Sequence, residues 1–190
     1  MSNNPAANIK NIKAIILDRD GVINHDSDEY IKSIDEWLPI DGSIDAIVQL
    51  KQRGFIVAVA SNQSGVGRGY FDLITLKAMH NKLHALLAQK GAVLDRLYFC
   101  PHHPDDHCQC RKPRTAMLQQ FADDFALSPE QILFIGDSKS DHDCAQAFGC
   151  AFLLVVTGKG EQQRTKLSAE LKFANDLCDA VNWLTSATDN

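Results

Sequence analysis

Two aspartates follow an apolar run directly in the stretch AIILDRDGVINHD, which covers residues 14–26. The side chains of residues i and i+2 in an extended segment project to the same side, so Asp18 and Asp20 would share one small volume. Two carboxylates this close repel each other, and burial opposes the ionisation of each. A bound cation, or a proton on one of the two carboxyl groups, would relieve this conflict. The pair therefore indicates chemistry at the end of the run.

Asp137 ends a second apolar run, QILFIGD, and would add a third oxygen donor. Oxygen ligands of this kind suit Mg²⁺, which commonly takes one or two carboxylates together with waters and a phosphate. Ionised Asp18 could then attack phosphorus and form an aspartyl-phosphate. Asp20 could protonate the leaving oxygen and later deprotonate the water that hydrolyses the intermediate.

Two further polar segments supply groups that such a reaction needs. Ser61, in SNQSG, and the amides after it could hold the non-bridging oxygens of a phosphoryl group, and Lys112, in CRKP, could balance its charge. Each pattern alone also has an ordinary structural interpretation, such as a turn, a loop, a helix cap or a solvated helix start. Because the signals stand at the ends of successive apolar runs, together they favour phosphoryl transfer.

The elements that would position these residues alternate along the chain. Apolar runs of strand length are followed by amphipathic segments of helical length, which predicts a parallel sheet covered by helices on both faces. The predicted strands cover 14–18, 55–62, 94–100, 131–137 and 151–156, and the predicted helices cover 43–54, 73–91, 114–126, 139–148 and 175–186. Ligands bind outside the carboxyl ends of the strands in such a sheet, so the polar residues after each run should converge on one site.

Length and composition indicate one α/β domain over residues 13–190, after a flexible lead-in over residues 1–12. The chain has 190 residues, of which 45% are hydrophobic and 23% are charged, as is typical of one globular domain. The net charge of −5 gives no general attraction to nucleic acid or to an anionic membrane. No run predicts a membrane span or a signal peptide, so we expect a cytoplasmic protein. We also expect a monomer, because the pattern leaves no apolar helix face in need of a partner.

The segment CPHHPDDHCQCRKP, residues 100–113, combines cysteines and histidines at the spacing of a structural zinc site. Three thiolates and one imidazole form a common closed tetrahedral set. The four predicted ligands are Cys100, His102, Cys108 and Cys110. The three other cysteines are scattered through apolar surroundings, and we expect them to be free thiols in a reducing compartment.

A zinc ion in this segment would be structural, because four protein ligands leave no open coordination position. It would pin a loop of little apolar content and position Arg111 and Lys112, which follow the last cysteine directly and are expected to open the next helix. Two alternatives stay open from the residues alone. His103 or His107 could replace His102 as the ligand, and the segment could be an exposed loop with unused thiols.

Four motifs, taken in order, resemble those of the haloacid dehalogenase superfamily of phosphohydrolases. They are LDRDGV, ASNQSGVGRG, CRKP and FIGDSKSD, and the resemblance covers residues 13–160. It implies that Asp18 is the nucleophile and that Asp20 is the general acid and base. It also implies that Ser61 and Lys112 stabilise the phosphoryl group.

The same resemblance implies a magnesium site. The side chains of Asp18 and Asp137 and the backbone carbonyl of Asp20 would be its protein ligands. Asp141 matches a further acidic position that supports the site in this superfamily.

Within the superfamily, the cysteine loop together with DRDGVIN and NQSGVGRGYF resembles the D-glycero-D-manno-heptose-1,7-bisphosphate 7-phosphatase family. The histidinol-phosphate phosphatase domain shares the CxH…CxC loop and is the competing resemblance, but the continuation SGVGRGYF favours the heptose enzymes. The resemblance implies hydrolysis of a small sugar bisphosphate in a step toward ADP-heptose for the lipopolysaccharide core, and it leaves the preferred anomer open. The residues that it places at the substrate are Asp26, Tyr30, Asn62, Gln63, Ser64 and Arg111.

No long insertion separates Asp20 from Ser61 or Ser61 from Lys112, where the superfamily often carries a cap domain. We therefore expect a site covered only by short loops, and a substrate whose far end is itself charged. Two other classes of protein are the alternatives: a receiver-like signalling domain and a zinc-stabilised binding module without catalysis. The DRD spacing opposes the first, since a receiver needs no acid or base two residues after its phosphorylated aspartate. The complete set of catalytic residue types opposes the second.

Overall fold

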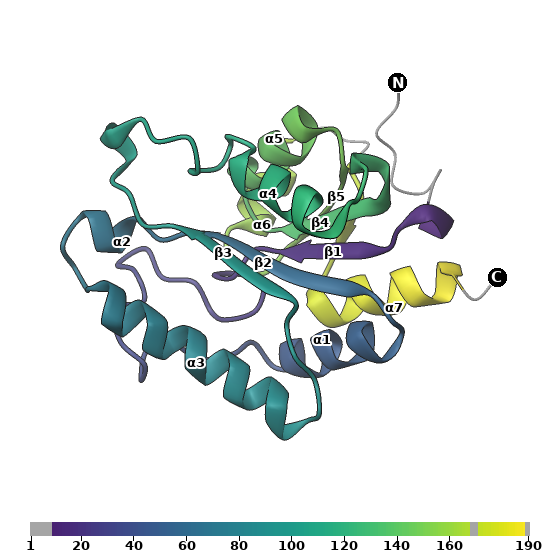
Figure 1. The fold of residues 1–190 in the computed structure, drawn as a ribbon, viewed down its shortest axis with the longest axis horizontal. Helices are drawn as coiled ribbons and strands as arrows, with labels where there is room; N and C mark the ends of the chain where they lie inside the picture. The colour runs from purple at the N-terminus through teal and green to yellow at the C-terminus, as the bar shows by residue number, and fades with distance from the viewer. Residues whose placement is uncertain (1–8, 168–170, 189–190) are drawn as a thin grey trace.

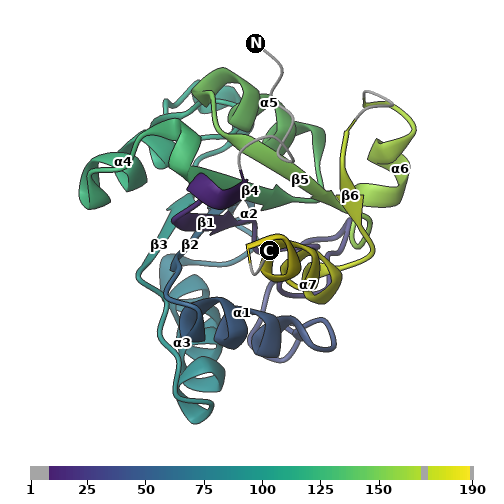
Figure 2. The same cartoon turned by 90° about the vertical axis from the view of Figure 1, so that its right-hand side faces the viewer.

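The computed structural model describes residues 9–167 and 171–188, and it has one parallel sheet between two layers of helices (Figures 1 and 2). The order of the strands in the sheet is β3-β2-β1-β4-β5-β6. Their bounds are β1 (Ala14–Leu17), β2 (Ile56–Asn62), β3 (Arg96–Cys100), β4 (Ile132–Gly136), β5 (Ala151–Val155) and β6 (Phe173–Ala174). The parallel sheet and the first five strands confirm the predicted α/β architecture, with ends that differ by one or two residues.

Both faces of the sheet are buried because successive side chains of each strand point to opposite faces. In β1, Ile15 and Leu17 join one apolar cluster, whereas Ala14 and Ile16 join the other. The first cluster is covered by α1 (Ser43–Gln52), α3 (Leu73–Gln89) and α7 (Leu177–Thr188). The second is covered by α4 (Ala116–Phe125) and α5 (Lys139–Phe148), on the opposite side of the sheet in Figure 1.

Several short elements were not predicted, because they are too short to show a hydrophobic period. They are α2 (Ser64–Gly67), α6 (Gly160–Arg164), β6 and the 3₁₀ turns η2 (Ile9–Asn11), η3 (Pro104–Asp106) and η4 (Pro129–Gln131). Strand β6 adds an edge strand beside β5, and the other short elements lie before or between the longer ones. None of the described helices has the length and apolarity that crossing a bilayer requires.

The N-terminal segment differs from the predicted flexible lead-in where it is described. Residues 1–8 of that lead-in lie outside the described part of the chain. Ile9 and Ile12, however, are buried in the first apolar cluster, with 7% and 8% of their surface exposed. The sequence pattern missed this because two isolated isoleucines among asparagines and lysines show no period.

The strand order fixes where a ligand can bind. From β1 the chain builds β2 and β3 on one side of the sheet, and it then returns to build β4 and β5 on the other side. The crevice at such a reversal, outside the carboxyl ends of the strands, is the usual ligand site of an open parallel sheet. The segments after β1, β2 and β4 meet there, and they carry the candidate catalytic residues. No second domain follows β1 or β2 in residues 9–167, as the lack of long insertions predicts.

Candidate active site

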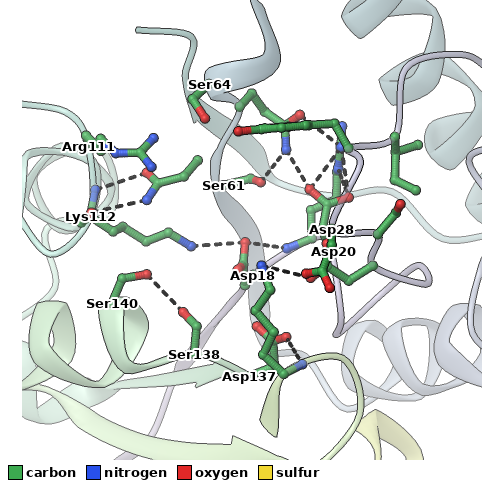
Figure 3. Close-up of a pocket in the computed structure, with 18 of the residues that line it drawn as sticks. Asp18, Asp20, Asp28, Ser61, Ser64, Arg111, Lys112, Asp137, Ser138 and Ser140 are labelled. Carbon is green, nitrogen blue, oxygen red and sulfur yellow. Dashed lines mark hydrogen bonds and ion pairs between the residues drawn. The ribbon is translucent and has the colours of Figure 1, made fainter. Parts of the chain in front are cut away.

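Asp18 follows the last residue of β1 and is held to the sheet through its backbone. Its amide donates to the carbonyl of Ile135 at 2.9 Å, so the β1–β4 ladder fixes this position. Its Oδ1 accepts from the amide of Arg19 at 2.7 Å and faces Nζ of Lys112 at 3.0 Å (Figure 3). No described residue donates a hydrogen bond to Oδ2. One oxygen of Asp18 is therefore anchored, and the other is available for chemistry.

Lys112 is buried, and its ammonium group has three partners. Nζ donates to the carbonyl of Ala60 at 2.7 Å and lies 2.6 Å from Oδ1 of Asp141 and 3.0 Å from Oδ1 of Asp18. Burial alone would lower the pKa of Lys112, but the carboxylates of Asp141 and Asp18 raise it above the usual lysine value. This lysine is therefore a fixed positive charge beside the anchored aspartate.

The backbone of Lys112 is positioned by Asn62, at the end of β2. The Asn62 amide group donates to the Lys112 carbonyl at 3.1 Å and accepts from the Lys112 amide at 3.0 Å. RKP was predicted to open a helix, and this is corrected by the structure, in which α4 begins at Ala116. The Lys112–Pro113 peptide bond is cis, and the lysine belongs to the turn before the helix. The Asn62 side chain thus holds the backbone of Lys112 in this turn.

Three aspartates form what we call the acid cluster: Asp18, Asp137 and Asp141. One ligand oxygen from each lies within 4.8 Å of the others, as a shared cation requires. Burial, followed by the charge of Asp141, raises the pKa of Asp18 to about 7. Burial, followed by the charge of Asp18, raises the pKa of Asp137 to about 8. Without a cation the cluster resists ionisation, so its geometry and electrostatics both fit a divalent metal.

Close backbone packing holds Asp137 in the acid cluster. Gly21 has φ +83°, and a Cβ there would lie 2.2 Å from Oδ2 of Asp137. A Cβ on Gly158 would meet the same oxygen at 2.2 Å, and Oδ2 also accepts from the amide of Lys159 at 2.8 Å. Two glycines and one backbone amide thus enclose this oxygen, and any larger side chain at either glycine would displace it.

Asp20 lines the same cavity as Asp18, as the i, i+2 spacing predicted, but its carboxylate has partners of its own. Strand β1 ends at Leu17, so Asp18 and Asp20 lie in the segment that follows it. The Asp20 carboxylate accepts from the guanidinium of Arg19 at 2.9–3.1 Å, from Nδ2 of Asn24 at 2.8 Å and from Nε2 of Gln63 at 2.7 Å. Burial opposes ionisation, but Arg19, then Asn24, outweigh it and lower the pKa of Asp20 below its usual value. Its carboxylate is therefore ionised and held beside the acid cluster rather than within it.

The segment after β2 brings more polar groups to the same place. Ser61 is buried, and its Oγ accepts from Nε2 of Gln63 at 2.8 Å, so one amide group links Ser61 to Asp20. Ser64 begins α2 and lies on the wall of the same cavity. The cavity has a volume of about 270 Å³, enough for a small polar ligand.

All eleven residues predicted for catalysis, magnesium binding and substrate contact line this cavity. They are Asp18, Asp20, Asp26, Tyr30, Ser61, Asn62, Gln63, Ser64, Arg111, Lys112 and Asp137. They come from segments far apart in sequence, and the fold brings them to one cavity at the carboxyl ends of the strands. The backbone of Tyr30 has φ +67°, and its ring packs edge-on against Tyr70 with centroids 5.0 Å apart.

The cysteine loop, residues 100–110, leaves the end of β3. Four sulfur and nitrogen atoms converge in it: Sγ of Cys100, Cys108 and Cys110 and Nδ1 of His102. Neighbouring atoms of this set are separated by 3.2 to 3.6 Å, as expected for donors around one shared centre. The other two histidines lie elsewhere: His103 caps η3 by accepting from the amide of Asp105, and His107 adopts φ +48° beyond it. The donor set therefore fits zinc with His102 as its imidazole ligand.

Comparison with known proteins agrees with this site. The HAD-hydrolase-like family model matches residues 109–180. D-glycero-beta-D-manno-heptose-1,7-bisphosphate 7-phosphatase from Pseudomonas putida is 52% identical over 170 residues, which cover 90% of this chain and 97% of the relative. The enzyme of that name from Neisseria meningitidis serogroup A is 45% identical, with 90% of this chain and 91% of the relative covered.

A solved structure extends the similarity to three dimensions. The crystal structure of D,D-heptose 1,7-bisphosphate phosphatase from B. bronchiseptica, complexed with magnesium and phosphate, has a TM-score of 0.89 and 43% sequence identity. The match covers 92% of this chain and 99% of that one. This chain belongs to the heptose-1,7-bisphosphate 7-phosphatase family. Membership decides against the receiver-like and non-catalytic alternatives, since the members matched are named as phosphatases.

Several residues that line the cavity of this chain were not predicted from its sequence. Lys159 joins two regions, because its amide holds Asp137 and its Nζ lies 3.2 Å from Oδ2 of Asp26. Lys159 could have been predicted from the sequence, because it follows the fifth predicted strand just as other site residues follow earlier strands. Arg19 and Ser138 also line the cavity. Arg19 could not be predicted as a site residue, because a charged residue between two aspartates is normally expected to be exposed, whereas the fold buries this one.

Proposed function

We propose that this chain is a Mg²⁺-dependent phosphatase that removes the 7-phosphate from D-glycero-β-D-manno-heptose 1,7-bisphosphate. The observation that carries the proposal is the free Oδ2 of Asp18 beside the buried ammonium of Lys112, in a cavity of small-ligand size. The names of the relatives supply the substrate, the position cleaved and the β anomer, which the residues alone leave open. In the cell the product would feed a step toward ADP-heptose for the lipopolysaccharide core.

The acid cluster supports magnesium as the cofactor. Asp18 and Asp137 would be side-chain ligands, Asp20 would contribute its backbone carbonyl, and Asp141 would support the site while pairing with Lys112. Bound Mg²⁺ would neutralise part of the carboxylate charge and polarise the phosphoryl oxygens. The raised pKa values of Asp18 and Asp137 are the electrostatic cost that such a cation would remove.

The first chemical step uses Asp18 and Asp20. Oδ2 of Asp18 attacks phosphorus, a bond forms between them, and the bond from phosphorus to the sugar oxygen breaks. Lys112 stabilises the charge on the non-bridging oxygens, with Ser61 and the α2 amides as donors on the β2 side. Asp20, once it has taken up a proton, delivers it to the leaving oxygen, so that the sugar departs as a neutral alcohol.

The second step reverses the role of Asp20. Its carboxylate removes a proton from water, and the oxygen of that water attacks the aspartyl-phosphate. Phosphate leaves, Asp18 regains its carboxylate, and the cycle can repeat. The ionised Asp20 with its three neighbouring donors corresponds to the basic state that this step requires.

Substrate contacts and zinc complete the proposal. Asp26 and Tyr30, on the segment after β1, would contact the sugar, together with Asn62, Gln63 and Ser64. Arg111 would recognise phosphate, because its Nη1 is buried without a hydrogen-bond partner among the described residues. A zinc ion on the cysteine loop would hold the chain that leads into Arg111 and Lys112.

The test is phosphate release with Mg²⁺ from the two anomers of heptose 1,7-bisphosphate and from histidinol phosphate, compared side by side. We expect the highest kcat/KM for the β anomer, with 1-phosphate retained on the product. A higher kcat/KM for histidinol phosphate would keep the mechanism and reject the substrate. The absence of phosphate release from all three would reject the proposed function.

A further inference from the structure

Arg19 is buried between the two site aspartates, with 1% of its surface exposed. Its Nε and Nη2 donate to Oδ1 of Asp20 at 3.1 and 2.9 Å, and Nη2 also donates to Oε1 of Gln63 at 2.9 Å. The third nitrogen, Nη1, points away from Asp20 and lies 3.4 Å from Nε2 of His80. The orientation of the guanidinium is therefore set from both ends, by Asp20 and by a residue 61 positions away.

His80 belongs to α3 and has no role in the acid cluster or the cysteine loop. It is 7% exposed, and its ring packs against Phe99 of β3 with centroids 5.5 Å apart. A guanidinium can only donate hydrogen bonds, so Nε2 of His80 must accept, and the ring proton must be on Nδ1. Burial, then the positive charge of Arg19, lowers the pKa of His80 to about 3, which agrees with a neutral ring.

We propose that His80 is a positioning residue: as a neutral acceptor for Nη1 of Arg19, it orients the guanidinium that holds the Asp20 carboxylate. This inference rests on the proposed function, in which Asp20 is the general acid and base. Without the acceptor, Nη1 would be a buried donor with no partner, and the guanidinium would turn to find another. Asp20 would keep Asn24 and Gln63 but lose the fixed orientation of its strongest partner. Proton transfer by Asp20 would then slow, although His80 never touches the substrate.

The contact itself can be tested without substrate. Long-range ¹H–¹⁵N NMR spectra of the imidazole rings in the full chain distinguish a protonated from an unprotonated ring nitrogen. We expect Nδ1 of His80 to carry the proton and Nε2 to be unprotonated, with assignment by loss of the signals in His80→Gln. A proton on Nε2 would overturn the proposal, because that nitrogen could not accept from Arg19. This result stands whether or not the proposed function is correct.

The kinetic test compares His80→Leu, which removes the acceptor, with His80→Gln, whose amide oxygen can replace it. We expect His80→Leu to lower kcat on the sugar bisphosphate at least fivefold with KM unchanged within twofold, and His80→Gln to keep kcat within twofold of wild type. His84→Leu, one turn further along α3, is the matched control and should leave kcat unchanged. If His80→Gln is as slow as His80→Leu, the acceptor role is rejected.

A substrate with a good leaving group separates positioning from a general structural effect. With enzyme in excess over p-nitrophenyl phosphate, nitrophenolate release reports transfer to Asp18 alone, and this step needs no acid because the leaving group is stable as an anion. We expect His80→Leu to leave this rate within twofold of wild type while it slows cleavage of the sugar bisphosphate. An equal loss on both substrates would show damage to the whole site and overturn the proposal. A wild type that cleaves neither substrate would instead reject the proposed function.

Discussion

The acid cluster and the cysteine loop could both hold a metal, but the fold supports them in different ways. Asp137 and Asp141 are buried, Asp18 is anchored to the strand ladder, and Lys112 compensates their charge. By contrast, none of residues 101–110 is buried, and this part of the chain contains only the short turn η3.

The difference lies in what orders the donor atoms. In the acid cluster the sheet brings the donors together and a cation lowers the cost of doing so. In the cysteine loop little apolar surface is buried, so a metal ion must supply much of the order. We infer that magnesium bound to the acid cluster would act on chemistry with a small effect on structure. Zinc bound to the cysteine loop would act on structure and would affect chemistry through Arg111 and Lys112.

The largest expected effect is that of Asp18→Asn, which removes the proposed nucleophile and keeps the shape. We expect turnover to fall by at least about 10³-fold, since the loss of a nucleophile leaves only background catalysis. The melting temperature in metal-free buffer at pH 8 should not fall. Because burial raises the pKa of Asp18 from 3.8 to about 7, its ionisation lowers the stability of the fold between these pH values, and the full cost is present at pH 8. Asparagine removes that charge. Asp123→Asn, on the exposed face of α4, is the control. A large loss of stability in Asp18→Asn would contradict the view that the sheet holds this site.

Lys112→Met tests whether the same site depends on charge compensation. We expect turnover to fall by about 10²–10³-fold, because a fixed cation beside the phosphoryl group is lost. We also expect a loss of about 3–5 kcal/mol in the free energy of unfolding, since Asp18 and Asp141 would lose their buried partner. Kinetics and urea unfolding measure the two effects, and Lys139→Met on α5 is the matched control. Unchanged stability would show that the carboxylates are compensated elsewhere.

Cys108→Ser tests the cysteine loop. We expect bound zinc to be lost and turnover to fall by about 10–100-fold, because the chain leading to Lys112 loses its anchor. Far-UV circular dichroism should stay unchanged, while limited proteolysis should begin to cut within residues 101–109. Cys178→Ser is the control, since that thiol donates to the carbonyl of Gly42, away from the loop. Global unfolding of Cys108→Ser would show that the loop supports the sheet as well.

Magnesium should have the smallest effect on structure. Because it binds the folded chain only, at 100 times its dissociation constant it should add about 2.7 kcal/mol to the free energy of unfolding. Asp137→Asn should abolish most of this gain. Urea titrations with magnesium and with a chelator of divalent cations measure this gain in stability. If proteases cut the strands of the sheet in the chelated sample, the view that magnesium has only a small effect on structure would be rejected.

The location of the site could be predicted from sequence, because each apolar run ends in a polar residue and parallel strands end at one edge. Asp18, Asn62 and Asp137 were found in this way, since their positions depend only on the strand that precedes them. The four residues of the Cys/His cluster were predicted from local spacing, and the structure brings His102 to the three thiols while His103 caps η3.

Other features depend on contacts that sequence does not display. The direction of the Asp20 side chain follows from where β1 ends and from a buried arginine whose partner lies on α3. The turn before α4 was mistaken for a helix start because proline is favoured in the first turn of a helix. An asparagine from another strand holds this turn instead. In both cases the deciding partner is distant in the chain, so no local pattern could reveal it.

The most direct test of the account is to trap the phosphorylated enzyme. Heptose 1,7-bisphosphate labelled with ³²P at the 7-position is mixed with enzyme and Mg²⁺, quenched in acid within milliseconds, and the protein is digested and mapped. We expect label on the peptide that contains Asp18, as an acyl phosphate that hydroxylamine releases, and no label in Asp18→Asn. Turnover without any labelled peptide, or label on another residue, would contradict Asp18 as the nucleophile.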